Sequence, residues 1–462
     1  MSDGIDSVWA DAGEQVAALA AGKVSSLELT DAAIARIERL DGPVNAVVVR
    51  DFERARAAAR AADAALARGE RRPLLGLPMT VKESHNIAGL PTCWGSPAFS
   101  RFVPERDSVG VTRLKTAGAV ILGKTNVPPF LSDWQSNNPV YGRTSNPWDL
   151  GRSPGGSSGG GSAALAAGFT ALEFGSDIGG SIRVPSAFCG VFGHKPSHGV
   201  IPSRGQSPPG TDGDGIPMAV IGPIARTAID LERALDVLAG PDEQEAVGYR
   251  LVLPPPRRKS LADYRVLVLT HHPLAATEAE IVAALETLAG RLEAEGGLVA
   301  RESERLPDLA RAHGVYISIL EPLMATPEAM NAPGAPPVGV LLSATYAQTM
   351  IRRGWRALFD DFDVVIAPAF GTVAYPHDDL PDQQARVLTI NGEATPYYAQ
   401  LAWPGTATLA NLPSTAVPIG QTASGLPIGA QIIGPYLEDR TTIAFAGLIE
   451  RAFGGFKPPP GY

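Results

Sequence analysis

The glycine- and serine-rich stretch between positions 151 and 196 constrains the fold of this chain more than any other part of the sequence. Within it, Ser157 and Ser181 each follow a Gly-Gly pair directly, and an apolar segment separates them. Because glycine permits close backbone approach and positive φ, such pairs indicate loops whose bare N–H groups can surround a reactive oxygen. Flanking apolar segments argue against a flexible linker. We therefore predict one site in which Ser181 is the nucleophile and Ser157 its proton partner.

The spacing and composition of this stretch resemble the amidase signature family. Residues 155–160 read GGSSGG, and residues 177–183 read DIGGSIR, which matches the family pattern DxGGSxR with its serine 24 positions after Ser157. Similar patterning runs from about Leu74 to Arg226, with weaker matches near 363–368 and 411–434. The resemblance implies an α/β fold with a large mixed central β-sheet covered on both faces by helices.

The resemblance also implies that residues 1–462 form a single amidase domain. Its expected parts are a helical N-terminal region (1–70), a signature core (74–240) and a C-terminal part (260–462) that completes the sheet and the substrate pocket. Hydrophobic periodicity independently favours alternating strands and helices. The expected strands are 77–81, 119–122, 171–174, 264–269, 363–367, 414–419 and 428–433, and the expected helices are 7–69, 109–117, 162–168, 229–238, 278–295, 306–359 (interrupted at 333–337) and 440–451.

A serine hydroxyl is a poor nucleophile until a base removes its proton, and a lysine can be that base only when it is neutral. The ordinary lysine pKa is about 10.4, so burial or a neighbouring cation must lower it. Lys82 ends a short apolar strand and fits this need, although such a lysine is more often a solvated surface residue. The family places its catalytic lysine in a GxPxxVKD-like segment, and residues 76–83 match it except for Glu83.

The resemblance implies a role for each residue of the site. Ser181 would attack the carbonyl, Ser157, held across a cis peptide bond, would relay the proton, and Lys82 would be the base and later the acid. The oxyanion would be stabilised by backbone N–H groups, those of Ile178, Gly179, Gly180 and Ser181. The residues expected to brace this network are Ser158, Asp177 and Arg183. These three are equally well explained as polar residues that stabilise turns.

Three other kinds of site are less well supported. Gly156–Gly160 satisfies the G-x-S-x-G pattern of α/β-hydrolases, but a turn rather than a strand precedes the serine. An α/β-hydrolase would also need an essential histidine, which would have to be one of His271, His272, His313 and His377. His194 and His198 are four apart, yet Pro196 between them prevents a regular helix. No Gly-Lys-Ser/Thr ends the glycine run, so a phosphate-binding P-loop is excluded. We expect no metal and no cofactor.

The expected reaction is hydrolysis of a linear carboxylic amide through an acyl-enzyme on Ser181. Aryl or fatty acyl amides, anilides, esters and carbamates all offer the required carbonyl and leaving group. The expected pocket residues are Ser132, Trp134, Gln135, Gln206 and Trp403, although many family members carry small residues where this chain has Asp133 and Trp134. The alternative is a glutamine-hydrolysing subunit of an amidotransferase. Ile178 and Val184 look closer to stand-alone amidases and fatty acid amide hydrolase-like enzymes.

Composition sets the remaining expectations. The 462 residues are 45% hydrophobic and 19% charged, enough for a large core, and the formal charge of −9 argues against nucleic acid as the main partner. Cys93 and Cys189 are the two cysteines, both among apolar or small residues, so no disulfide framework is expected. Neither a signal peptide nor a long apolar run is evident. We expect a cytoplasmic monomer or homodimer that acts on a small molecule.

Overall fold

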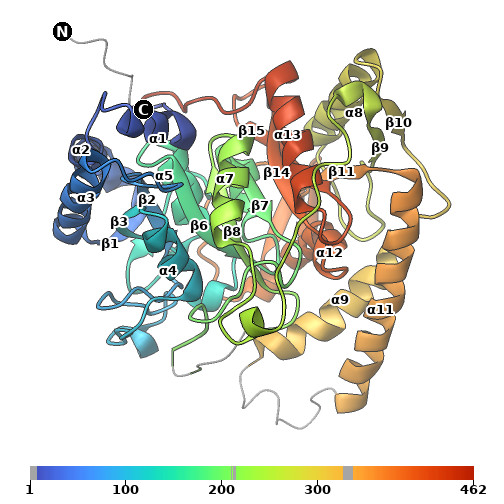
Figure 1. The fold of residues 1–462 in the computed structure, drawn as a ribbon. Helices are drawn as coiled ribbons and strands as arrows, with labels where there is room; N and C mark the ends of the chain where they lie inside the picture. Colours follow the sequence, from blue (N-terminus) through green and yellow to red (C-terminus); the bar gives the residue numbers. More distant parts are fainter. Residues whose placement is uncertain (1–7, 210, 212–214, 326–336) are drawn as a thin grey trace.

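An 11-stranded mixed β-sheet forms the centre of the computed structural model, which describes residues 8–209, 211, 215–325 and 337–462. The strand order is β1-β3-β2-β6-β8-β7-β14-β15-β11-β9-β10 (Figure 1). The strands are β1 (Val47–Arg50), β2 (Pro78–Lys82), β3 (Val120–Thr125), β6 (Leu172–Asp177), β7 (Phe192–Lys195), β8 (Val220–Ala225), β9 (Arg265–Val268), β10 (Leu298–Ala300), β11 (Val364–Pro368), β14 (Ser414–Gln421) and β15 (Pro427–Ile433). The expected large mixed sheet is confirmed.

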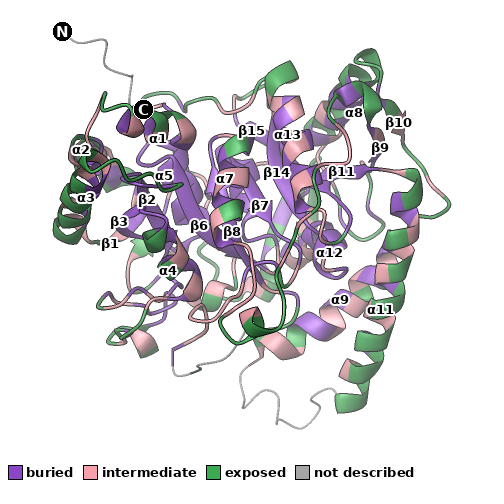
Figure 2. Cartoon of the chain, viewed as in Figure 1, coloured by how far each residue is buried: buried purple, intermediate pink, exposed green. Residues whose placement is uncertain are grey.

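Helices cover both faces of this sheet, because the strands are apolar on both sides. The helices are α1 (Ala12–Ala20), α2 (Ser26–Val44), α3 (Phe52–Ala67), α4 (Val109–Thr116), α5 (Gly159–Ala166), α6 (Arg183–Cys189), α7 (Ala228–Leu238), α8 (Ala279–Ala294), α9 (Leu309–Met324), α11 (Val338–Asp361), α12 (Ala402–Thr408) and α13 (Asp439–Phe453). For example, Ile366 of β11 belongs to the core cluster that contains residues of α7, α8 and α13, whereas its neighbour Val365 belongs to the cluster that contains residues of α9 and α11. Burial is concentrated in the strands and exposure on the outer helices (Figure 2).

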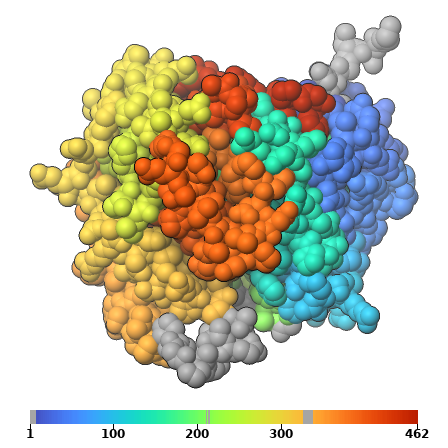
Figure 3. All heavy atoms as spheres, turned by 180° about the vertical axis from the view of Figure 1, so that it is seen from behind, coloured from blue at the N-terminus to red at the C-terminus, as the bar shows by residue number. Residues whose placement is uncertain are grey.

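Two short hairpins lie outside the central sheet. They pair β4 (Asn137–Asn138) with β5 (Gly142–Arg143), and β12 (Val387–Ile390) with β13 (Glu393–Pro396). On the face opposite to that of Figure 1, the orange segment that contains β12 and β13 occupies the middle of the surface (Figure 3). Among the described residues, no helix combines the length and the apolar character needed to cross a lipid bilayer.

The N-terminal region differs from the expectation that residues 7–69 are helical. The β-branched run that contains Val47 and Val49 forms β1, which pairs antiparallel with β3. Ser25 and Glu28 form a capping box at the start of α2, and α2 continues past Gly42-Pro43 to Val44. A proline in the last turn does not stop the helix, which ends where Asn45 adopts a left-handed conformation.

Several strands were not expected from the sequence. Residues 192–195 and 220–225 form β7 and β8, which join the two halves of the sheet, and residues 298–300 form the edge strand β10. The helical segment expected at 306–359 is two helices, α9 and α11. The interruption expected at 333–337 lies outside the described residues except for Pro337, which directly precedes α11.

The position of the site follows from the pairing of β2 with β6. These strands are parallel, with Thr80 opposite Glu173 and Val81 opposite Phe174. Parallel strands end at the same edge of a sheet, where loops leave room for a binding site. Lys82 at the end of β2 and Asp177 at the end of β6 therefore meet at one edge.

Candidate active site

Lys82 is a fully buried lysine whose ammonium group faces three serine hydroxyls. Its Nζ lies 2.7 Å from Ser157 Oγ, 2.8 Å from Ser158 Oγ and 2.9 Å from Ser176 Oγ. The exposed fraction of the residue is 0%. A lysine is almost never fully buried unless something in the structure requires it. The structure thus brings Lys82 and Ser157 together, as the sequence predicted.

Burial lowers the pKa of Lys82 to about 7, because the charged ammonium loses its hydration. The negative charges of Asp177 and Glu173 oppose this shift only in part. Burial also raises the pKa of Glu173 to about 7, which reduces its negative charge near neutral pH. Half of the Lys82 amines are therefore neutral near pH 7 and able to accept a proton.

A backbone hydrogen bond joins the segment that carries Ser157 to the segment that carries Ser181. The Gly156–Ser157 peptide bond is cis, as the resemblance implied, and α5 begins two residues later. The N–H of Ser158 donates to the carbonyl oxygen of Ser181 at 3.0 Å. The Ser181 side chain makes no hydrogen bond among the described residues, and the exposed fraction of this residue is 6%. Ser181 thus lies beside the lysine–serine cluster with its hydroxyl uncommitted.

The glycines of this segment allow neighbouring backbones to approach closely. A Cβ atom on Gly156 would lie 2.4 Å from the carbonyl oxygen of Asp133, and one on Gly160 would lie 2.3 Å from the backbone nitrogen of Asn126. Carbon atoms do not approach that closely without displacing their neighbours. The run is therefore a packed element and not a linker.

Asp177 and Arg183 form a buried ion pair that braces the loop before Ser181. The guanidinium Nη2 of Arg183 lies 2.8 Å from Asp177 Oδ1, and both side chains are completely buried. Burial raises the pKa of Asp177, but the charge and hydrogen bonds of Arg183 outweigh it and bring that pKa to about 2. The carboxylate also accepts the N–H groups of Gly180 and Ile182 at 3.0 Å each.

Two side chains outside the glycine-rich stretch hold the carbonyl groups of the loop. The hydroxyl of Tyr316 in α9 donates to the Ile178 carbonyl oxygen at 2.8 Å, and the indole Nε1 of Trp134 donates to the Gly179 carbonyl oxygen at 2.8 Å. In a trans peptide the N–H points away from the carbonyl oxygen. Fixing the Ile178 carbonyl therefore fixes the direction of the Gly179 N–H.

Comparison with known proteins agrees with this arrangement. The family model described as Amidase matches residues 28–326 and 335–443. The chain belongs to the amidase signature family. It is 34% identical to a glutamyl-tRNA(Gln) amidotransferase subunit of Anaeromyxobacter sp. (strain K), with 97% of each chain covered. It is 32% identical to fatty-acid amide hydrolase 2-A of Danio rerio, with 95% of this chain and 87% of the relative covered.

Solved structures give the same picture. One, from a vestigial protein complex described as revealing the evolutionary origins of an s-triazine catabolic enzyme, is 31% identical to this amidase, with a TM-score of 0.83 over 96% of this chain and 99% of the other. A bacterial aryl acylamidase of the amidase signature family is 24% identical, with a TM-score of 0.82 over 96% of each chain, and supports the fold. The chain is thus a hydrolase of the family that acts on amides.

The expected pocket residues of this amidase lie in different surroundings. Trp134 reaches the loop before Ser181, whereas Gln135 is tied to the backbone of Asp378 on both its amide atoms. The Ser132 hydroxyl donates to the Pro129 carbonyl oxygen, and Gln206 Nε2 lies 3.2 Å from Ser84 Oγ. Trp403 is fully buried and donates to Thr277 Oγ1. The structure therefore places Trp134 at the candidate active site and Trp403 within a core cluster.

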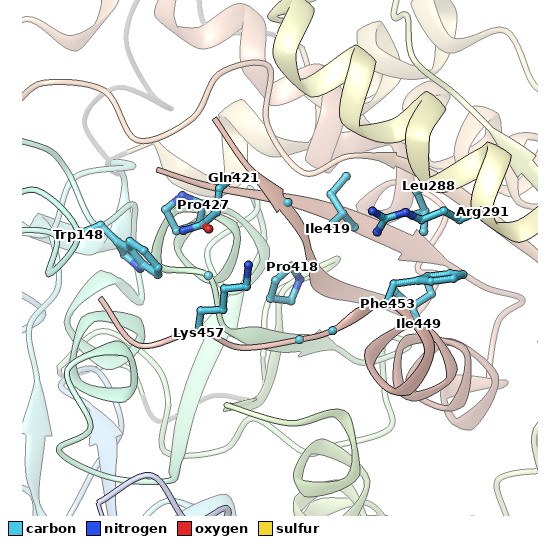
Figure 4. Close-up of a pocket in the computed structure, with 14 residues that line it drawn as sticks. Trp148, Leu288, Arg291, Pro418, Ile419, Gln421, Pro427, Ile449, Phe453 and Lys457 are labelled. Atoms are coloured by element: carbon cyan, nitrogen blue, oxygen red, sulfur yellow. The ribbon is translucent and has the colours of Figure 1, made fainter. Parts of the chain in front are cut away.

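A separate pocket of about 210 Å³ lies between the β14–β15 hairpin, α8 and α13. Figure 4 shows Trp148, Lys457, Phe453 and Arg291 around it. None of the three expected catalytic residues lines this pocket. It is consequently not the site of the expected reaction.

Histidines take no part in the lysine–serine cluster. His85 stacks on Phe174, and burial lowers its pKa to about 3. His194 lies between Thr415 Oγ1 and Asp439 Oδ1, a satisfied buried histidine. Across the ranges that the structure describes, no group of three or more His, Cys, Asp or Glu side chains is arranged to hold a metal ion.

Sequence reasoning missed two residues of the site. Ser176 contributes a third hydroxyl to Lys82, and its place directly before Asp177 at the end of a strand is a signal that could have found it. Tyr316 comes from α9, far along the chain, and no local pattern marks it. Long-range contacts of this kind become visible only in the folded chain.

Proposed function

We propose that this amidase hydrolyses a carboxylic amide through an acyl-enzyme on Ser181, with Ser157 as proton relay and Lys82 as base. The observation that carries the proposal is the fully buried Lys82 amine, which has its pKa lowered to about 7 and lies 2.7 Å from Ser157 Oγ. Ser181 Oγ attacks the carbonyl carbon and gives its proton to Ser157, which passes its own proton to Lys82. The C–N bond then breaks as Lys82 returns the proton through Ser157 to the leaving nitrogen. Water releases the acid by the same steps.

The hydrogen bonds around Lys82 favour this direction of proton transfer. A neutral amine donates two hydrogen bonds and accepts one. Ser158 Oγ has the Ser176 carbonyl oxygen as an acceptor at 3.3 Å, so this hydroxyl can accept from Lys82. If Ser158 and Ser176 take the two N–H bonds, the amine lone pair faces the hydroxyl of Ser157. Ser157 can then lose its proton to Lys82.

The proposed oxyanion hole uses backbone N–H groups of residues 178–181. The N–H of Gly180 already donates to Asp177 Oδ1. Those of Ile178, Gly179 and Ser181 have no acceptor among the described residues. We therefore assign the stabilisation of the developing oxyanion to these three groups, with Asp177, Arg183 and Ser158 as positioning residues. Loss of one such donor typically costs about 100- to 1,000-fold in rate.

Tyr316 offers a test of the proposed oxyanion hole. Tyr316→Phe removes the hydrogen bond to the Ile178 carbonyl oxygen, so the Gly179 N–H is held less firmly toward the reacting oxygen. We expect kcat to fall by about fivefold to tenfold, the value of one neutral hydrogen bond, while KM changes by less than about twofold. Steady-state kinetics beside Tyr346→Phe, an exposed tyrosine in α11, measures this. An increase in KM at constant kcat would assign Tyr316 to substrate binding instead.

A buried aromatic cluster beside the loop that precedes Ser181 supports a class of substrate. Trp134 contacts Phe370 and Tyr397 edge-on, at ring-centroid distances of 4.8 and 5.0 Å. Aromatic side chains near a reacting centre suit an apolar or aromatic acyl or amine group. Relatives described as fatty-acid amide hydrolase support fatty acyl amides, and an acyl-enzyme also permits aryl amides, anilides, esters and carbamates.

The second candidate function is hydrolysis of glutamine as one subunit of an amidotransferase. It is supported by the relative described as part of a glutamyl-tRNA(Gln) amidotransferase, at 34% identity over nearly the whole chain. Ile178 and Val184 depart from the family pattern of these subunits, which favours a free-standing enzyme.

A substrate screen on the purified chain separates the two functions. We expect hydrolysis of aryl amides, anilides or fatty acyl amides without any partner protein, and at most weak release of ammonia from glutamine. Product formation by chromatography and ammonia release by a coupled assay measure the two reactions, with Ser181→Ala as the blank. Efficient glutamine hydrolysis combined with inactivity on every other amide would favour the second function.

A further inference from the structure

A cavity of about 550 Å³ lies on one face of α11, and the side chains that line it have more positive than negative charges. The helix lies at the edge of the molecule in Figure 1, and the cavity extends from it to the segments 410–412 and 435–438. Its charged lining consists of four arginines and two acids, Arg257, Arg352, Arg353, Arg356, Asp360 and Glu438. The chain as a whole has a net charge of −9. Such a local excess of arginine in an acidic protein needs an explanation.

Three of these arginines have no counterion in the described part of the chain. Arg257 is satisfied, because Glu438 accepts its Nε and Nη2 at 2.6 and 2.8 Å. Among the described residues, Arg352, Arg353 and Arg356 make no hydrogen bond to an acceptor and have no carboxylate within 4.0 Å. Like charges three or four residues apart on a helix destabilise it. An anion bound between these side chains would relieve their mutual repulsion.

Arg352 is held in place for such an anion. Its guanidinium carbon lies 4.9 Å from the centre of the Tyr436 ring, and the Tyr436 hydroxyl donates to the His198 carbonyl oxygen at 3.0 Å. A side chain that is already oriented loses less entropy when a ligand binds. The planar guanidinium also matches two oxygens of a phosphate at once.

We propose that this arginine cavity binds a small oligophosphate, such as a pyrophosphate group or a nucleoside polyphosphate, through Arg352, Arg353 and Arg356. Three guanidinium groups match the roughly two to four negative charges that such a ligand carries in a small volume. A monocarboxylate would neutralise only one of the three positive charges. An extended polyanion such as RNA would also meet Asp360, Glu438 and the negative charge of the whole chain. The site is separate from the proposed catalytic residues, none of which lines it.

Isothermal titration calorimetry on the full chain tests this site independently of any activity. Pyrophosphate and ATP are titrated separately at constant ionic strength, with sulfate and a single-stranded RNA as comparison ligands. We expect saturable binding of one pyrophosphate or ATP per chain. In Arg353→Gln/Arg356→Gln, which changes two exposed side chains, the Kd is expected to rise by at least about tenfold.

The matched control is Arg39→Gln/Arg60→Gln, which removes the same charge from exposed positions on α2 and α3. It is expected to bind pyrophosphate like the wild type. The proposal is overturned if the wild type binds neither ligand, if both double variants lose affinity equally, or if sulfate binds as tightly as pyrophosphate. Tighter binding of RNA than of ATP, lost in Arg353→Gln/Arg356→Gln, would also overturn it and assign the surface to nucleic acid.

Discussion

Replacing Ser181 by alanine is expected to lower kcat/KM by about 10⁴-fold or more, because the variant has no nucleophile to form the acyl-enzyme. The protein should remain folded, since the Ser181 hydroxyl makes no hydrogen bond among the described residues. Kinetics on the best amide from the screen, with circular dichroism as a check of folding, measure this effect. A fluorophosphonate should label the wild type at Ser181, as located by peptide mass mapping.

Ser186→Ala is the matched control for this variant. Ser186 is also buried, but its hydroxyl donates to the carbonyl oxygen of Ile182, the residue before α6, and we expect most of the activity to remain. Near-normal turnover by a folded Ser181→Ala protein would rule out Ser181 as the nucleophile. A fluorophosphonate adduct on another serine would do the same.

Replacing Lys82 by methionine is expected to lower kcat/KM by about 10²- to 10⁴-fold, the usual contribution of a general base, while preserving the volume of the side chain. In the wild type, kcat/KM should rise with pH and reach half of its plateau near pH 7. The sign follows from the lowered pKa: below about 7 the amine is protonated and cannot accept a proton, and above it the amine is neutral. The residual activity of Lys82→Met should lack this rise.

Lys124→Met provides the control for Lys82. Lys124 is also fully buried, and burial lowers its pKa to about 8, but its amine donates to the Pro91 carbonyl oxygen and to Thr92 Oγ1. We expect this variant to keep the pH profile of the wild type even if it is less stable. A wild-type profile that is flat or favours acid would contradict a neutral lysine as the base.

The sequence predicted those parts of the fold and site that depend on local pattern. Apolar runs located β2, β6 and β15 to within a few residues, and the GGSSGG segment located Ser157 and Ser158, two of the three serines that Lys82 contacts. These patterns suffice because strand formation and close backbone approach are decided by neighbouring residues.

What the sequence could not predict depends on contacts between distant residues. β7 and β8 contain Gly193 and Pro223, which weaken their strand pattern, and their place in the sheet is decided by pairing with β6 and β14. Trp403, which was expected to line the substrate pocket, is completely buried by tertiary packing. Tyr316 donates to the Ile178 carbonyl oxygen although the two residues are 138 positions apart in the sequence. Hydrophobic periodicity describes neighbouring residues and does not predict such a contact.

The close contacts at Gly156 and Gly160 have a consequence for anyone who wishes to redesign this enzyme. A stretch rich in glycine usually invites the engineer to stiffen it with alanine, since fewer unfolded conformations then remain. At Gly156 and Gly160 the space that a methyl group would need is already filled, by the backbone of residues 133–135 and of Asn126, so alanine at either position would displace that backbone. Libraries aimed at new substrates should therefore leave Gly156 and Gly160 unchanged and vary the buried aromatic cluster around Trp134.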